Sequence, residues 1–290
     1  MNFKISIASG KGGTGKTTVA VTLFELLGQK YPGQTQLIDC DVEEPNDLIF
    51  FPGIEKTQEQ NVNQLIPEID PEKCTYCRKC SEFCEFNAIT ILPSVPFAEV
   101  NHSLCHSCGA CIEACEYNSI NEHGYPVGKI SKYITHKNFL LEGKLKIGSA
   151  MQTFLIRELK KNSEKDAVIS IYDAPPGTSC PVVETVSETN FIVLVTEPTP
   201  FGLYDLKLSI EMLQEINIPF GIVINKSGIG NREVYAYIKE NKLNLLGEIS
   251  FSRDYAAMYS RGELIRHIPP EIKKQYNVIV SNLLKYMESE

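Results

Sequence analysis

Apolar segments of strand length alternate with segments of helix length along most of this chain. A buried strand is predicted at Phe3 to Ser9, and after a glycine-rich stretch a helix is predicted from Lys16 to Gly28, where glycine is a typical stop signal. A second, short strand is predicted at Gln36 to Ile38. Further apolar strands are predicted at residues 168–172, 191–196, 220–224 and 245–249. This alternation predicts an α/β fold with a mostly parallel sheet covered by helices on both faces.

The alternating pattern is interrupted once. After Pro67 the composition changes abruptly to cysteine and charge, and the pattern resumes at about Ser131. We therefore expect an α/β domain formed by residues 1–62 and 131–290, with a small α+β domain of residues 63–130 inserted into it.

The predicted insert contains an internal repeat with a period of 31 residues. An aromatic residue is matched by an aromatic residue, which is hard to obtain by accident and indicates two halves related by pseudo-symmetry. The first half has Cys74, Cys77, Cys80, Cys84, Glu85, Phe86, Asn87 and Ile89, and the second has Cys105, Cys108, Cys111, Cys115, Glu116, Tyr117, Asn118 and Ile120.

Each half carries C-x₂-C-x₂-C-x₃-C, the run that holds [4Fe–4S] clusters in bacterial ferredoxins. The fourth cysteine of such a run ligates the cluster of the other half. We therefore expect two cluster-binding sets of cysteines. The first set is Cys74, Cys77, Cys80 and Cys115, and the second set is Cys84, Cys105, Cys108 and Cys111. Structural zinc is the main alternative, although zinc sites usually pair two short C-x-x-C knuckles.

The insert departs from the ferredoxin pattern in one respect. The proline that usually follows the fourth cysteine is replaced by Glu85 in one half and by Glu116 in the other. Carboxylates that point toward anionic clusters oppose the addition of an electron, so we expect somewhat lowered reduction potentials. Of the two cysteines outside the insert, Cys40 is expected to be a small buried residue. Cys180 is more ambiguous, and we favour a structural role over that of a cluster ligand because no second cysteine matches it to complete such a site.

Residues Gly10 to Thr17 read GKGGTGKT and fit the phosphate-loop template G-x-x-x-x-G-K-[ST] between a strand and a helix. The glycines allow successive backbone N–H groups to surround phosphate oxygens, and the start of the helix adds its positive end. Lys16 is expected to reach the outer phosphates and Thr17 to ligate Mg²⁺. The residues expected to contact ATP or ADP in this loop are Gly10, Lys11, Gly12, Gly13, Thr14, Gly15, Lys16, Thr17 and Thr18.

With its early lysine, Lys11, the string KGGTGKTT resembles the deviant Walker A motif of the MinD/ParA family, whose relatives include nitrogenase iron protein and the Mrp-type ATPases. The resemblance implies a P-loop ATPase in which Lys11 reaches across an ATP-dependent homodimer to the partner's nucleotide. It also implies that Asp41 is the switch I aspartate, which positions water and assists Mg²⁺, and that Asp173 is the Walker B aspartate. Asn225 matches the family's adenine-contacting asparagine, although an asparagine after a strand is also a common turn former.

Composition limits the range of partners. The formal net charge is -8 over 290 residues, without a dense basic run, and this argues against nucleic acid as the main partner. No apolar stretch is long enough to span a bilayer, and the segment Pro270 to Glu290 has an acidic end unlike a membrane-surface helix. We expect this segment to pack against the sheet, in a cytoplasmic protein with no stable membrane anchor.

These features favour an ATP-binding and ATP-hydrolysing iron–sulfur protein in which ATP gates electron transfer to an unknown redox partner. The clusters have no open coordination position, which favours electron transfer over catalysis at the clusters. An iron–sulfur scaffold or carrier, a cobyrinate-type amide ligase and a pure regulatory switch are the alternatives. The carrier-type Mrp relatives use a C-terminal C-x-x-C, and this sequence has no cysteine after Cys180.

Overall fold

The computed structural model describes residues 2–135 and 137–289, and the chain divides into two compact units. The sheet unit consists of Met1–Gln60, Ile130–Lys144 and Gln152–Glu290. The cysteine-rich unit consists of Asn61–Lys129 and Leu145–Met151. Two long strands, β3 (Glu55–Ile69) and β6 (Ile120–Thr135), have residues in both units, so the chain passes between the units within regular structure.

A nine-stranded sheet has the order β11-β10-β9-β1-β8-β2-β7-β6-β3. The pairs that β1 forms with β8 and β9, β2 with β7 and β8, and β10 with β9 and β11 are all parallel, as expected from the sequence. The other strands of this sheet are β1 (Phe3–Ala8), β2 (Thr35–Asp39), β7 (Asn138–Leu145), β8 (Ile169–Asp173), β9 (Phe191–Thr196), β10 (Phe220–Ser227) and β11 (Leu245–Ser250).

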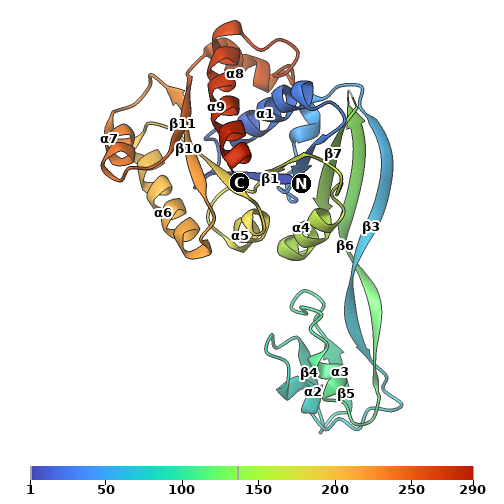
Figure 1. Ribbon diagram of the computed structural model, residues 1–290. Helices are drawn as coiled ribbons and strands as arrows, with labels where there is room; N and C mark the ends of the chain where they lie inside the picture. Colours follow the sequence, from blue (N-terminus) through green and yellow to red (C-terminus); the bar gives the residue numbers. More distant parts are fainter. Residues whose placement is uncertain (1, 136, 290) are drawn as a thin grey trace. The chain divides into compact units, whose positions relative to one another are not determined.

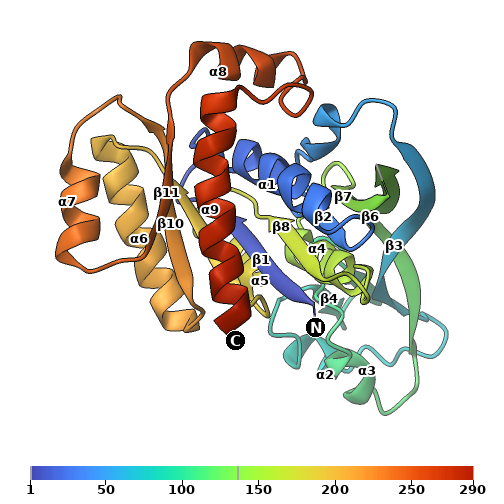
Figure 2. The same cartoon turned by 45° about the horizontal axis from the view of Figure 1, so that its top comes forward.

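Helices cover both faces of the sheet (Figures 1 and 2). Helices α1, α8 and α9 lie on one face, and α5, α6 and α7 lie on the other, together with α4, which packs beside α5. Their bounds are α1 (Lys16–Lys30), α4 (Gln152–Lys161), α5 (Cys180–Val186), α6 (Pro200–Ile216), α7 (Glu233–Glu240), α8 (Arg253–Ser260) and α9 (Pro270–Ser289), and a short 3₁₀ helix, η1 (Asp47–Phe50), follows β2.

The core follows from the two-residue period of the central strands. On β9, Phe191, Val193 and Val195 belong to the cluster that contacts α1 and α9, whereas Ile192 and Leu194 belong to the cluster that contacts α5 and α6. All five side chains are buried because both faces are covered, and the strand therefore reads as a continuous apolar run.

The C-terminal helix packs against the sheet, as the sequence predicts. Its apolar stripe includes Ile272, Ile279 and Leu283, each at most 1% exposed, while Val278 on another side of the helix is exposed. Within the described residues, no helix is both long enough and apolar enough to cross a membrane.

The expected helix stop at Gly28 is wrong, because α1 continues to Lys30. The glycine has a packing role instead. A Cβ atom at this position would lie 2.5 Å from Nδ2 of Asn138 on β7, and Asn138 Oδ1 accepts a hydrogen bond from the N–H of Gly33 at 2.9 Å. Gly28 therefore lets α1 approach a buried amide that fixes the turn before β2.

The cysteine-rich unit repeats its local geometry. The short helices α2 (Lys79–Glu82) and α3 (Ala110–Glu113) occupy equivalent places in the two halves, and β4 (Ile89–Leu92) pairs antiparallel with β5 (Phe97–Val100). The left-handed residues also correspond, since Tyr76, Arg78 and Asn87 in the first half match Ser107, Gly109 and Asn118 in the second.

The packing role of Gly28 is testable because it reverses a usual trend. Alanine in place of a helical glycine normally stabilises by roughly 0.5–1 kcal/mol. We expect Gly28→Ala to destabilise by about 1–3 kcal/mol instead, since it overpacks a buried contact. Urea unfolding measures the change. In an Asn138→Ala background the same substitution should cost nothing, and an equal cost in both backgrounds would contradict this explanation.

Candidate functional site

The glycine-rich loop connects β1 to α1 at the carboxyl end of the strand. Gly13 and Gly15 adopt left-handed conformations, with φ of 78° and 89°. Asn225 Nδ2 donates to the Thr14 carbonyl at 2.7 Å, and a Cβ atom on Gly15 would lie 2.1 Å from that nitrogen. The side chain of Asn225 on β10 therefore holds the loop in place. Asn225, expected after the strand, lies within β10 and both lines the pocket and braces the loop.

Lys16 and Thr17 converge on Asp173 at the end of β8. Lys16 Nζ lies 2.8 Å from Asp173 Oδ1, and the Thr17 hydroxyl donates to Asp173 Oδ2 at 2.7 Å. Burial opposes the charge of Lys16, but the carboxylate of Asp173, together with the charges of Asp47 and Asp39, outweighs it and raises the pKa of the lysine. Two residues expected to bind phosphate and Mg²⁺ therefore share one buried carboxylate.

Two further buried aspartates, Asp39 and Asp47, lie close enough to Lys16 and Asp173 to interact with their charges. The sequence analysis did not identify them. Asp39 accepts hydrogen bonds from the N–H groups of Asp41, Asn46 and Asp47 at 2.8–3.1 Å. Burial, followed by the charge of Asp173, raises the pKa of Asp39 to about 8. Asp39 thereby fixes the start of the segment that carries Asp41.

Asp47 is fully buried, and neither of its carboxylate oxygens has a hydrogen-bond partner among the described residues. Burial raises its pKa well above the ordinary value, and the charges of Asp39 and Asp173 raise it further. A buried polar group without a partner is destabilising, so this side chain is an unfavourable feature of the nucleotide-free protein.

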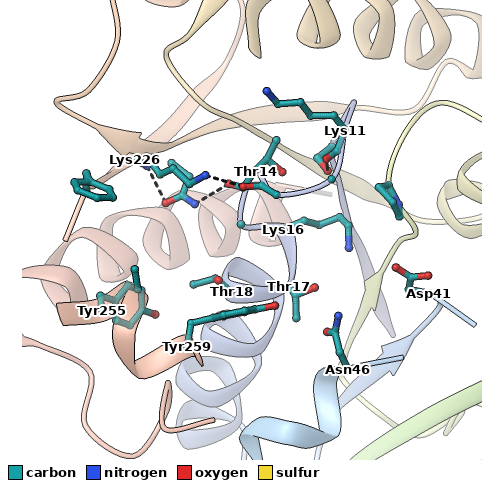
Figure 3. A pocket seen from close by; sticks show the side chains of 18 of the residues that line it. Lys11, Thr14, Lys16, Thr17, Thr18, Asp41, Asn46, Lys226, Tyr255 and Tyr259 are labelled. Carbon is teal, nitrogen blue, oxygen red and sulfur yellow. Dashed lines mark hydrogen bonds between the residues drawn. The ribbon is translucent and has the colours of Figure 1, made fainter. Parts of the chain in front are cut away.

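Asp41 is half-buried and lines the same pocket as the loop. Burial raises the pKa of its carboxyl, and the positive charge of Lys16 acts in the opposite direction. Asp41 and Lys16 are both labelled in Figure 3: Asp41 follows the end of β2, whereas Lys16 is the first residue of α1.

Lys11 forms an ion pair that sequence analysis did not anticipate. Its Nζ lies 2.7 Å from Oε1 of Glu197, the residue directly after β9, and 5.8 Å from the centre of the Phe201 ring. Lys226 Nζ contacts the other oxygen of Glu197 at 3.0 Å and donates to the Gly13 carbonyl at 2.7 Å. Glu197 therefore connects the early lysine of the loop to β10.

The loop borders a pocket of about 430 Å³ (Figure 3), a volume in the range of small-ligand sites. Phe251, Tyr255 and Tyr259 supply an aromatic wall opposite the loop. The Tyr255 hydroxyl is within 2.8 Å of the Thr22 hydroxyl, which ties α8 to α1. The pocket therefore offers backbone amides and lysines at one part and aromatic rings at another.

In the cysteine-rich unit, each expected set of four cysteines lines its own small pocket. Cys74, Cys77, Cys80 and Cys115 line one, and Cys84, Cys105, Cys108 and Cys111 line the other. Within the ranges 2–135 and 137–289, no three His, Cys, Asp or Glu side chains lie close enough together to hold one metal ion.

Backbone N–H groups point at cysteine sulfurs in the same way in both halves. Cys74 Sγ accepts from Tyr76 N at 3.4 Å, and Cys105 Sγ accepts from Ser107 N at 3.5 Å. Cys84 Sγ likewise accepts from Ala88 N at 3.3 Å. Donors directed at sulfur stabilise thiolate character, which a metal-bound cysteine needs.

The remaining two cysteines differ in exposure. Cys40 is buried, as expected, and burial raises its thiol pKa well above the ordinary value. Cys180 is exposed at the first position of α5, so it has no part in packing the core. Its preferred role as a structural residue rather than a cluster ligand stays a prediction.

The residues that the sequence analysis missed share a weak signal. Asp39 and Glu197 each stand at or directly after the carboxyl end of a strand, where the ends of parallel strands meet. Tyr255 and Tyr259 are spaced as neighbours on one helix face. Neither signal distinguishes a site residue from a turn or core residue without knowledge of the strand order.

Comparison with known proteins agrees with the site in the sheet unit. The model of the CobQ/CobB/MinD/ParA nucleotide binding domain matches residues 5–265. The cell division ATPase MinD of Pyrococcus furiosus has a similar fold, with a TM-score of 0.61 at 20% identity, covering 99% of this chain and 100% of that one.

Two sequence relatives differ in how much of the chain they cover. An uncharacterized protein of Methanocaldococcus jannaschii is 35% identical over 234 residues, which span 79% of this chain and 80% of the relative. An iron-sulfur cluster carrier protein of Aquifex aeolicus is 28% identical over 138 residues, which span 41% of this chain and 38% of the relative.

The cost of burying Asp47 predicts a stabilising substitution. Asp47→Leu removes both unpartnered oxygens, keeps the branched shape of the side chain and should stabilise the nucleotide-free protein by about 1–3 kcal/mol in urea unfolding. The folded carboxyl keeps its proton to higher pH than the unfolded one, so wild-type stability falls as pH rises above the usual aspartate range, and the advantage of the variant grows.

The matched control is Asp166→Leu at an exposed position, which should leave stability nearly unchanged. A loss of stability in Asp47→Leu, or an advantage that shrinks as pH rises, would show that Asp47 has partners that favour its charge.

Proposed function

We propose that this chain, which belongs to the CobQ/CobB/MinD/ParA family of nucleotide-binding domains and is a P-loop ATPase, uses its ATP cycle to gate electron transfer through two [4Fe–4S] clusters. The observation that carries the proposal is the presence, in one chain, of a phosphate loop with its pocket and of two four-cysteine pockets with ferredoxin spacing.

In the nucleotide site, the loop amides and Lys16 would bind the phosphates, and Thr17, Asp41 and Asp173 would hold Mg²⁺ directly or through water. A bound Mg²⁺ neutralises charge on the phosphates as the terminal bond breaks. With Lys16 turned to the phosphates and Thr17 to the metal site, the Asp173 carboxylate would lose both of its present partners and would be free to accept hydrogen bonds from water. Asp41, which lines the same pocket, would orient the attacking water, and the rings of Tyr255 and Tyr259 would contact the base.

Lys11 acts in trans within an ATP-dependent homodimer in this proposal. In the single chain its ammonium is held by Glu197, and its side chain is 30% exposed. A partner's ATP carries more negative charge than one carboxylate, so the nucleotide competes for the lysine. The Lys11–Glu197 pair would then open as the dimer forms.

The two cysteine sets support the cluster part of the proposal by their composition. Three cysteines of each set come from one half of the repeat and the fourth from the other half, as in two-cluster ferredoxins. The four corners of an iron–sulfur cube are separate, so its four thiolates need not converge on one point. The four thiolates of each set would fill the coordination positions of all four irons, which suits electron transfer rather than substrate chemistry.

The route for coupling in this proposal is the chain itself. The segment that carries Asp41 continues through η1 into β3, and β3 has residues in both units. A change in this segment on ATP binding or hydrolysis therefore acts on a strand that continues into the cysteine-rich unit. Ordering of switch segments by nucleotide is a common way for an ATPase to transmit its state.

The second candidate function is an iron–sulfur cluster carrier, and the partial similarity to a protein of that name favours it. That similarity covers 41% of this chain. The absence of a cysteine beyond Cys180 in the sequence weighs against a cluster bridged by a C-terminal cysteine pair.

The role of Lys11 is tested by dimerisation with a non-hydrolysable ATP analogue, measured by light scattering after size exclusion. Lys11→Ala should abolish the nucleotide-dependent dimer. Glu197→Gln keeps the shape of the side chain but removes the ion pair with Lys11. It should lower the analogue concentration at which half of the protein is dimeric by about two- to fivefold. Lys161→Ala on α4 is the control and should behave as wild type. A normal dimer in Lys11→Ala would contradict the role in trans.

The gating proposal is tested by anaerobic redox titration with and without MgATP, followed by visible absorbance. Bound MgATP should shift the midpoint potential of at least one cluster, and Lys16→Ala should remove that shift while keeping the iron. Identical curves with and without MgATP would mean independent modules. Rapid transfer of clusters to an apo-acceptor protein would favour the carrier.

A further inference from the structure

The two halves of the cysteine-rich unit repeat their cysteines but not their charges. Arg78 and Lys79 line the pocket of the first set. The equivalent residues in the pocket of the second set are Gly109 and Ala110, which carry no charge. An acidic residue, Glu122, lines the second pocket, whereas its equivalent in the first is Ile91.

The two glutamates that follow the fourth cysteine of each run also differ in their ion pairs. Glu116 follows a cysteine of the first set, and its carboxylate forms an ion pair with Lys79. Glu85 follows a cysteine of the second set, and no ion pair involves it within residues 2–135 and 137–289. Because the residue equivalent to Lys79 is Ala110, the second half has no lysine at the corresponding position to neutralise Glu85.

The two halves also differ in the hydrogen bonds to one cysteine sulfur, and again the first set has the additional stabilising contact. Cys115 of the first set has the Ser119 hydroxyl at 3.2 Å from its Sγ in addition to the N–H of Ser119 at 3.5 Å. Cys84 of the second set accepts from the corresponding N–H, that of Ala88, at 3.3 Å, and alanine has no hydroxyl to add a second contact.

Positive charge near a cluster and hydrogen bonds to its sulfurs both stabilise the reduced, more negative state and raise the reduction potential. Resting on the two-cluster function proposed above, we propose that Lys79, Arg78 and Ser119 make the cluster of the first set the easier one to reduce. One electron from an external donor then settles on that cluster, with no bond broken, while the cluster of the second set is the lower-potential, more strongly reducing site. The unit therefore has a defined internal direction for electrons, toward the half that contains α2.

The experiment exchanges the residues that differ between the halves. Lys79→Ala combined with Ser119→Ala copies the second half into the first, and Ala110→Lys combined with Ala88→Ser does the reverse. Midpoint potentials are measured by titration with a chemical reductant at low ionic strength, where surface charges are least screened, and the reduced clusters are followed by electron paramagnetic resonance.

Wild type should titrate in two separate steps. The first variant should lower the potential of the higher step only, and the second variant should raise the potential of the lower step only. A wild type with one unresolved step, or a first variant that shifts only the lower step or neither, would overturn the assignment. Equal iron content in all proteins establishes that the shifts do not come from lost clusters.

Failure of this inference and failure of the proposed function give different results. Metal analysis without iron overturns the proposed function, and this assignment with it, before any titration. If the midpoint potentials of both titration steps are unchanged by MgATP, gating by ATP is wrong. The order of the two potentials and its dependence on Lys79 and Ser119 are unaffected by that result.

Discussion

The arrangement of the sheet unit depends on one buried contact, the ion pair between Lys16 and Asp173. The loop and α1 supply the cation, and β8 supplies the anion from the neighbouring strand of a parallel sheet. Because the carboxyl ends of parallel strands meet at one edge, Asp39 of β2 lies near the same charge. Lys16 thus balances a group of carboxylates that would otherwise repel one another, and a bound metal ion would take over that role when the lysine turns to phosphate.

Three further groups in and around the site are either unpaired in the interior or already paired within the chain. Asp47 is buried without partners, Asp39 holds its proton to unusually high pH, and Lys11 is held by a glutamate of its own chain. A cation bound near Asp173 would offset the charge that opposes ionisation of Asp39 and Asp47, and a phosphate would offer Lys11 a second anionic partner. A site of this kind sacrifices stability in one state to respond to a ligand, which is common where function needs strained or unpaired groups.

The sequence was sufficient for those parts of the molecule that short-range patterns determine. The phosphate loop and the apolar central strands follow from local spacing, and the resemblance drawn from Lys11 led to the right family. The two cluster-binding sets of cysteines stay a prediction from their spacing. Contacts between residues far apart in the sequence could not be predicted from it. Gly28 reads as a helix stop but serves a contact with Asn138, and Glu197 has no motif yet pairs with Lys11. The polar strand β3 lacks an apolar alternation over its first residues, so it gave no strand signal.

Gating of electron transfer by ATP is the central claim, and thermodynamic reciprocity provides its most direct test. If bound MgATP changes the reduction potential of a cluster, reduction must change the affinity for MgATP by the same factor. The decisive measurement is the dissociation constant of a non-hydrolysable MgATP analogue for the oxidised and the fully reduced protein, under anaerobic conditions. The account predicts two different constants in wild type, and equal constants would contradict it.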